Sequence, residues 1–274
     1  MGSENGGRLQ RPDLHIAGYG GPGSRKSTFF STLPQPIVVA HFDAVGKDMP
    51  YWRLGKVGDV QTAKDGLQFR EVVRKDGALA ARIDYYTDLD IENPKAASLF
   101  LERLNKLPKQ IGKGECKTFC FETVTSSSLK TRKWYQYDLE SGARDPRKWY
   151  GGAVDILEEV LLIQLPGMHC NVCVGLHESK TKIEAEGGLV RAPNLPGRLL
   201  ESFASQWPEI YHMYVDFDRK SGDKAWLIQT QSDGKWEATT QIDAPDPCDG
   251  HYSELWVNWD KMLRKQEKVA DIKG

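Results

Sequence analysis

A glycine-rich run near the start of the chain constrains its fold more than any other feature. The run follows an apolar stretch at residues 14–17 and reads Gly20-Gly21-Pro22-Gly23-Ser24-Arg25-Lys26-Ser27-Thr28. The pattern G-x-x-x-x-G-K-[ST] forms a loop between a strand and a helix, and its backbone N–H groups, lysine and hydroxyl bind phosphates and Mg²⁺. Every position fits except the second glycine, which is Arg25. The run therefore predicts a phosphate-binding loop before a helix over residues 26–33, whose N-terminal dipole favours anions.

This loop supplies the first group of candidate site residues. We predict that ATP and Mg²⁺ are the cofactors, with Lys26 neutralising the β- and γ-phosphates and Ser27 as a metal ligand. Arg25 is expected to weaken phosphate binding relative to glycine, because its Cβ stands where backbone must approach the ligand. The opposite outcome is a guanidinium contact with phosphate, and the alternative for the whole run is an ordinary glycine-rich turn. The predicted nucleotide-binding residues are Gly20, Gly21, Gly23, Ser24, Arg25, Lys26, Ser27 and Thr28.

The size and charge of the chain limit the classes of protein to which it can belong. Its 274 residues suffice for one α/β domain, predicted over residues 13–245, between a disordered tail at 1–12 and a helical extension at 246–274. A net charge of -1 with 27% charged residues excludes a generally basic nucleic-acid binder, so contacts with DNA or RNA would come from local basic loops. No apolar stretch is long enough to cross a bilayer, so we expect a soluble, cytoplasmic protein with no membrane partner.

The five cysteines are odd in number and scattered, which favours reduced thiols over a disulfide framework. Cys170 and Cys173 have the spacing of a zinc or redox pair. No second such pair is present, and on a strand residues three apart face opposite ways. We therefore interpret both as buried core residues.

The order of elements predicts a three-layer α/β fold with a parallel sheet, followed by C-terminal antiparallel strands and a closing helix. Further core strands are expected over residues 36–43, 117–122 and 169–176. A β-ribbon at 66–87 is expected outside the core sheet, and a helix from Pro94 is expected to end near Pro108. Other expected elements are helices at 129–139, 154–165 and 253–268, loops at 141–149 and 178–196, and antiparallel strands at 208–217, 224–231 and 235–240.

Three polar residues follow predicted core strands and should meet at their carboxyl edge, where such sheets bind ligands. Glu122 is the candidate for the Mg²⁺ shell, and strand-end capping is its alternative. Asp43 is a candidate to orient water or the metal shell, and turn formation is nearly as good an explanation. His177 could contact the γ-phosphate, although a strand-end histidine is often only a surface residue. We take Asp43, Glu122 and His177 as the candidate catalytic residues.

Two basic segments are candidates for binding single-stranded nucleic acid, because cationic grooves with aromatic platforms suit it. The first segment joins its basic residues to Trp149, and the second is the long loop at 178–196 with the residues that follow it. For either segment alone, a solvated charged loop is the alternative. The candidate contacts are Arg144, Arg147, Lys148, Trp149, Lys180, Lys182, Arg191 and Arg198.

The glycine-rich loop and four further segments resemble the phage-encoded RecA-like P-loop ATPases that are implicated in single-strand annealing and recombination. The resemblance spans about residues 13–245. The family implies a RecA-type core that assembles into homo-oligomers in the host cytoplasm. It also implies binding of single-stranded DNA through loops after the third and fourth core strands, beside a single-strand-binding protein. The segments are Val38-Val39-Ala40-His41-Phe42-Asp43, Phe119-Cys120-Phe121-Glu122-Thr123-Val124-Thr125-Ser126, Gly175-Leu176-His177-Glu178 and Pro193-Asn194-Leu195-Pro196-Gly197-Arg198.

The chain departs from this family at three positions around the γ-phosphate. Arg25 replaces a glycine, Glu122 replaces an aspartate, and Val45 stands where the catalytic glutamate is expected. These substitutions predict slow or lost hydrolysis, so nucleotide binding is the safer expectation. Two rivals remain open: a non-catalytic, nucleotide-dependent assembly or virion component, and a small nucleoside-phosphate kinase. The β-rich C-terminal third does not resemble such a kinase.

Overall fold

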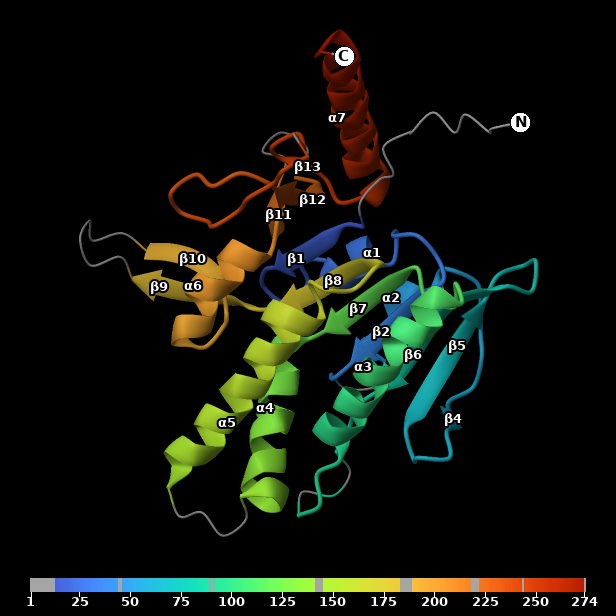
Figure 1. The fold of residues 1–274 in the computed structure, drawn as a ribbon, viewed down its shortest axis with the longest axis vertical. Helices are drawn as coiled ribbons and strands as arrows, with labels where there is room; N and C mark the ends of the chain where they lie inside the picture. The colour runs from blue at the N-terminus through green and yellow to red at the C-terminus, as the bar shows by residue number, and fades with distance from the viewer. Residues whose placement is uncertain are drawn as a thin grey trace.

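The strand that leads into the glycine-rich loop, β1 (His15–Tyr19), lies near the middle of one large sheet (Figure 1). The computed structural model describes residues 13–43, 46–88, 90, 92–140, 145–182, 189–217, 222–242 and 244–273. For residues 180–182, 189–190, 197–198 and 263–273 it describes the backbone alone. Within these ranges the sheet has eleven strands.

The six central strands are parallel and lie in the order β11-β1-β8-β7-β2-β6. Because β8 lies between β1 and β7, the strand that enters the loop is not a neighbour of the strand that ends at Glu122. This order, with the loop after β1, is that of a RecA-like P-loop core, and it confirms the predicted fold class. The new strands are β2 (Ile37–His41), β6 (Leu79–Tyr85), β7 (Thr118–Glu122), β8 (Asn171–Leu176) and β11 (Glu209–Phe217).

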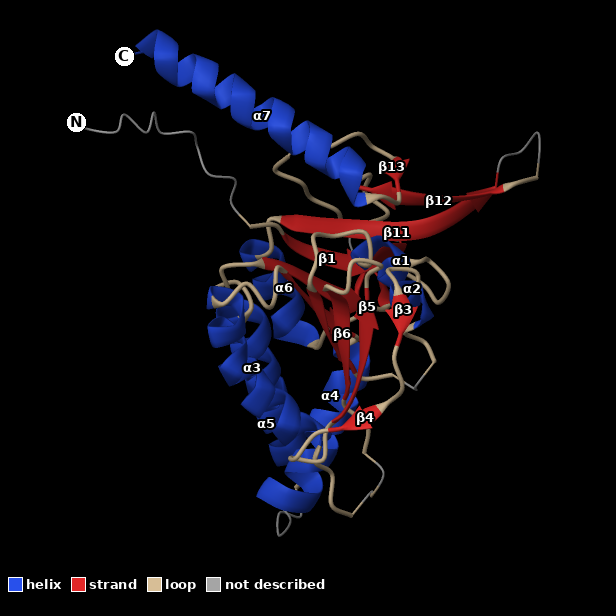
Figure 2. Ribbon diagram, turned by 90° about the vertical axis from the view of Figure 1, so that its right-hand side faces the viewer, coloured by secondary structure: helices blue, strands red, loops and turns tan. Residues whose placement is uncertain are grey.

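Helices cover both faces of the sheet and give three layers (Figure 2). One core lies under α3 (Ala96–Gly112), α5 (Pro146–Glu158) and α6 (Gly197–Gln206), and the other lies under α1 (Lys26–Phe30) and α2 (Met49–Trp52). Successive residues of a strand alternate between the two cores, as the pleat requires. Thus Phe119 and Phe121 pack in the first core and Cys120 in the second. The central strands are therefore apolar on both faces, which is why they read as continuous apolar runs.

The predicted ribbon at 66–87 forms, but its position was wrong. Strand β5 (Gln68–Val73) pairs antiparallel with β6, and β6 pairs in parallel with β2 from Ile37↔Ala81 to His41↔Tyr85. The ribbon therefore extends the core sheet instead of lying outside it. The physical reason is burial, since Ala80, Ala81 and Ile83 are fully buried in the core under α1 and α2. Two short strands, β3 (Lys56–Val57) and β4 (Gln61–Thr62), pair with β5 at this edge.

The C-terminal strands predicted at 208–217 and 224–231 do pair antiparallel, but the first of them also has a parallel neighbour that the prediction missed. Strand β11 pairs in parallel with β1, from Ile16↔Glu209 to Tyr19↔His212, and so completes the core. On its other side β11 pairs antiparallel with β12 (Lys224–Gln229), which in turn pairs antiparallel with β13 (Cys248–Asp249). The strand expected at 235–240 makes only isolated bridges. One of them holds Thr239 beside Ile210, so this segment lines the core strand without forming a regular strand.

The two helices expected at 129–139 and 154–165 begin earlier than predicted. Helix α4 (Val124–Trp134) begins after Thr123, whose side chain accepts a hydrogen bond from the Ser126 N–H. Helix α5 begins at Pro146, after the N-cap Asp145. Both continue as π-helices, η1 (Tyr135–Leu139) and η2 (Glu159–Gln164). The expected loop at 141–149 is therefore helical from residue 146 onward.

Two further boundaries differ from the expectations. Helix α3 continues through Pro108 to Gly112, because the buried Leu104 and Leu107 hold its turns against the sheet. The segment expected as a long loop at 178–196 contains the hairpin of β9 (Glu178–Lys182) and β10 (Leu189–Pro193). The closing helix is α7 (Tyr252–Lys273). Among the helices described, none is long and apolar enough to cross a membrane.

The five cysteines are free and buried. Cys170 and Cys173 lie in different cores, one on each side of the sheet. The interpretation of both as core residues is therefore confirmed.

Candidate nucleotide-binding site

The glycine-rich loop opens into a cavity of about 450 Å³ at the carboxyl edge of the parallel sheet. The three candidate catalytic residues, Asp43 after β2, Glu122 at the end of β7 and His177 after β8, line this cavity together with loop residues 22–28. The sequence predicted this convergence from strand ends alone. Their chemical roles stay predictions.

Lys26 lies folded across the loop. Its Nζ donates to the carbonyls of Gly20 at 2.9 Å and Gly21 at 3.2 Å, and to the Ser24 Oγ at 3.2 Å. Burial lowers the pKa of Lys26, and the nearby carboxylates of Glu122, Glu178 and Asp43 oppose that shift. A phosphate entering the loop would replace neutral acceptors with charged ones, and charge-assisted hydrogen bonds are roughly twice as strong.

Gly20 is required by close packing against β11. A Cβ at this position would lie 2.1 Å from the carbonyl oxygen of Met213. Real side chains never come so close, so only glycine fits here. The start of the loop therefore packs directly against the core strand β11.

Arg25 occupies the conformation that the missing glycine would have taken. Its backbone has φ 62° and ψ 28°, in the left-handed region, which costs a residue with a Cβ about 1–2 kcal/mol. Its guanidinium lies 3.2 Å from the centroid of the Trp226 ring on β12. A cation–π contact at an exposed site contributes about 0.5–1 kcal/mol, which offsets part of this cost. The sequence identified the unusual residue, but gave no sign of its aromatic partner.

Glu122 is buried, 4% exposed, and holds two hydroxyl groups. Ser27 donates to its Oε2 at 2.8 Å, and Tyr51 donates to its Oε1 at 2.7 Å. Burial raises the pKa of Glu122 to about 7, although the two hydroxyls and Lys26 act in the other direction. Tyr51 was not among the predicted residues, because it lies on the four-residue helix α2, which leaves no pattern in the sequence.

Asp43 is tied to the start of α4. Its Oδ1 accepts hydrogen bonds from the Ser126 Oγ and, at 3.4 Å, from the Thr123 Oγ1. These contacts hold the carboxylate at the edge of the cavity and also match the turn-forming alternative. His177 is half-buried, and burial lowers its pKa, so at neutral pH it is an uncharged imidazole. Val45 lies outside the described residues.

The polar groups that line the cavity fit a nucleotide bound with Mg²⁺. The Ser27 hydroxyl and the Glu122 carboxylate are already in contact, and Mg²⁺ prefers such oxygen ligands. The first amides of α1, at residues 26–28, have no partner within the helix by its geometry, so they are available to phosphate oxygens. Lysine, hydroxyl, carboxylate and amides thus meet in one cavity.

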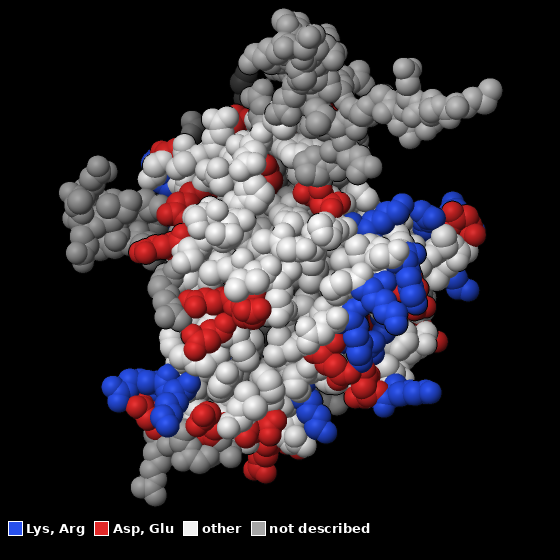
Figure 3. Space-filling model, in the orientation of Figure 1, with Lys and Arg blue, Asp and Glu red and all other residues white. Residues whose placement is uncertain are grey.

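The first predicted nucleic-acid segment lies at the tip of the α4–α5 hairpin. Arg147, Lys148 and Trp149 lie on the first turn of α5 instead of a loop, and Arg144 lies outside the described residues. The Arg147 guanidinium pairs with Asp145 at 2.8 Å, and the Trp149 Nε1 donates to the Glu140 carbonyl at 3.3 Å. In Figure 3, Lys and Arg side chains gather at this tip, at the lower left. They gather again over α3 and β5, at the right.

The second predicted segment includes the β9–β10 hairpin and the start of α6. Lys180 and Lys182 lie on β9 and Arg198 on α6, and only their backbone is described. Arg191 on β10 pairs with the Glu178 Oε1 at 3.0 Å and lies over the Trp236 ring at 4.6 Å.

The Glu178 carboxylate in this ion pair lies beside the phosphate loop. A Cβ at Gly21 would lie 3.7 Å from the Glu178 Oε1. Like Tyr51, Glu178 lies near the candidate site, and the sequence analysis assigned it no role there.

No protein-family model matches the chain, and no curated protein matches it significantly. The solved structures to which it is similar include the following two. A KaiC-like protein from the archaeon Pyrococcus horikoshii OT3 shares 10% identity at a TM-score of 0.37, covering 79% of this chain and 77% of its own. The flagellar accessory protein FlaH from Methanocaldococcus jannaschii shares 10% identity at a TM-score of 0.38, covering 86% of this chain and 87% of its own.

Proposed function

We propose that the protein is a Mg²⁺-dependent, ATP-binding RecA-like protein that acts on single-stranded DNA in annealing or recombination. The observation that carries the nucleotide part is the contact of Ser27 with Glu122 beside Lys26, in one cavity at the carboxyl edge of the sheet. The DNA part is supported by the basic and aromatic residues at the tip of the α4–α5 hairpin. Homo-oligomers and a single-strand-binding protein as partner belong to the same proposal.

Each group in the cavity has a defined task in this proposal. Lys26 would transfer its hydrogen bonds from loop carbonyls to phosphate oxygens, and Ser27 with ionised Glu122 would hold Mg²⁺. The metal would neutralise charge on the phosphates. Asp43, fixed by the hydroxyls of Thr123 and Ser126, accepts a proton or orients a water at the cavity edge.

Hydrolysis is expected to be slow, well below the ~10 s⁻¹ that is typical of enzymes, with or without single-stranded DNA. The reason is that Glu122 is longer than the usual aspartate and partly protonated near pH 7, which weakens its hold on the metal. Phosphate release should be measured for wild type, Asp43→Asn and His177→Ala, with ATP affinity measured in parallel. Fast turnover that disappears in one variant without loss of ATP affinity would contradict this prediction and assign that residue to water positioning.

Binding to single-stranded DNA should weaken steeply as salt rises, because each neutralised phosphate releases counterions. Replacing Arg144, Arg147 and Lys148 with Ala should flatten the slope of log K against log salt by roughly 2 units, at about 0.7 for each contact. Trp149→Ala should weaken binding by roughly 1–3 kcal/mol through lost base stacking. Fluorescence anisotropy with a labelled oligonucleotide measures both.

The matched control replaces Lys109 and Lys113, exposed lysines at the end of α3, with Ala. It should leave the salt slope unchanged. Absence of DNA binding at low salt, with and without ATP, would remove the DNA part of the proposal.

The second candidate function is a nucleotide-dependent assembly or virion component, in which ATP is a structural ligand. The raised pKa of Glu122 favours it only through the slow hydrolysis expected above, because slow turnover leaves bound ATP in place as a structural ligand. ATP-promoted oligomers with negligible turnover and no DNA binding would support this candidate over the first.

A further inference from the structure

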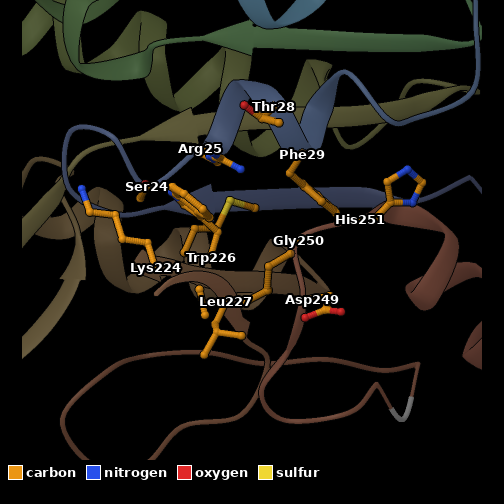
Figure 4. Close-up of a pocket in the computed structure, with 13 residues that line it drawn as sticks. Ser24, Arg25, Thr28, Phe29, Lys224, Trp226, Leu227, Asp249, Gly250 and His251 are labelled. Atoms are coloured by element: carbon orange, nitrogen blue, oxygen red, sulfur yellow. The ribbon is translucent and has the colours of Figure 1, made fainter. Parts of the chain in front are cut away.

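A second cavity, of about 300 Å³, lies beside the phosphate loop, between α1 and the C-terminal strands (Figure 4). Ser24, Arg25 and Thr28 line both this cavity and the one that contains Glu122. Its far side comes from β12 and the segment around β13, including Trp226, Asp249 and His251. The two cavities therefore adjoin each other at the N-terminal turn of α1.

Phe29 and Trp226 are the large aromatic residues that line the cavity, and the Arg25 guanidinium covers the ring of Trp226. The guanidinium carbon lies 3.2 Å from the centroid of Trp226, which leaves no room for a third flat group between them. Arg25 itself is exposed, and cation–π contacts at exposed sites are weak. A planar ligand that also stacks on Trp226 can therefore displace the guanidinium.

We propose that this cavity binds the nucleobase, which stacks on the Trp226 face that Arg25 covers in the nucleotide-free protein. The proposal rests on the proposed nucleotide binding and extends it to the base. A triphosphate held by Lys26 and the first turn of α1 has its base end outside the loop, and the adjoining cavity is lined by the same turn. The cavity combines an apolar face with the polar side chains of Asp249 and His251, as a heterocycle with hydrogen-bonding edges requires.

When the base displaces the Arg25 guanidinium from Trp226, the guanidinium becomes free to bind a phosphate group. Its Cα is in the loop that contacts the phosphates, and a guanidinium binds phosphate oxygens with two parallel hydrogen bonds. On binding, Arg25 exchanges an aromatic face for an anion. Its left-handed backbone is kept in both states, because the exchange needs only side-chain rotations.

The test compares the affinities of Mg²⁺–ATP and Mg²⁺–tripolyphosphate for the full chain by calorimetry. Tripolyphosphate has the phosphates without the base. Trp226→Ala should weaken ATP by roughly 10- to 100-fold, the range that base stacking on an aromatic gives, and leave tripolyphosphate unchanged. Trp226→Phe, which keeps an aromatic face and guards against a folding defect, should weaken ATP less. Trp134→Ala, at a tryptophan on α4 that lines neither cavity, is the matched control and should change neither ligand.

Arg25→Gly and Trp226 fluorescence test the displacement. The glycine variant should raise the ratio of ATP to tripolyphosphate affinity, because the base no longer competes with a guanidinium. Fluorescence should change on addition of ATP but not tripolyphosphate, and this difference should be lost in Trp226→Phe.

The possible failures are distinguishable. If wild type binds neither ligand, the proposed nucleotide binding fails and this inference fails with it. If wild type binds ATP but Trp226→Ala weakens both ligands equally, or neither, the base lies elsewhere and only this inference is overturned. A lower ATP-to-tripolyphosphate ratio in Arg25→Gly would overturn the displacement.

Discussion

Lys26→Ala is expected to lose Mg²⁺–ATP binding while it keeps its fold. The Nζ already makes three hydrogen bonds inside the loop, so it is positioned where the β- and γ-phosphates would lie. A hydrogen bond to a charged group contributes about 1.5–3 kcal/mol, so losing two of them should weaken binding by roughly 100-fold or more. Calorimetry with ATP measures the affinity, and circular dichroism checks the fold.

Lys109→Ala, an exposed lysine on α3, is the matched control for charge and should bind ATP like wild type. Unchanged ATP affinity in a folded Lys26→Ala protein would remove the assignment of the phosphate loop. The proposed function would then have to be abandoned.

The second large effect is expected for Glu122→Gln, which should stabilise the nucleotide-free protein at pH 8 by up to about 3 kcal/mol. The pKa of this carboxyl is about 7 in the fold against 4.5 when exposed, and each unit corresponds to about 1.4 kcal/mol. Between these values the folded chain holds a proton that the unfolded chain has lost. Stability is therefore complete below pH 4.5 and declines as the pH rises through 7.

Urea unfolding at pH 5 and pH 8 measures this effect. Between pH 5 and pH 8 the ionisation of Glu122 should lower the free energy of unfolding of the wild-type protein by about 2.5 kcal/mol. The glutamine variant should not show this loss. Glu102→Gln, an exposed site on α3, should leave the pH dependence unchanged. An identical pH dependence in wild type and Glu122→Gln would show that the buried carboxyl does not titrate in this range.

The sequence predicted those parts of the fold that depend on local patterns. The loop, its strand and the ends of β2, β7 and β8 follow from short apolar runs and turn residues. The positions of β6 and β11 did not, because each pairs in parallel with a strand far away in sequence, β2 for one and β1 for the other. Antiparallel hairpin signals beside both strands were visible and correct, but they showed only one of the two partners of each strand.

The candidate site shows the same division. Asp43, Glu122 and His177 were placed together by the rule that parallel strands end at one edge. Tyr51 and Trp226 were missed, because their contacts with Glu122 and Arg25 join residues 71 and 201 positions apart. Side chains that meet through tertiary packing leave no spacing to detect.

The close approach of Gly20 to Met213 has a consequence for synthesis of the chain. When the ribosome has released the phosphate loop and every element up to α6, β1 still lacks β11 as its neighbour. The loop therefore cannot reach its final shape until residues 209–217 have emerged and paired. A nascent chain arrested before that point, or a fragment that ends there, should be unable to capture nucleotide.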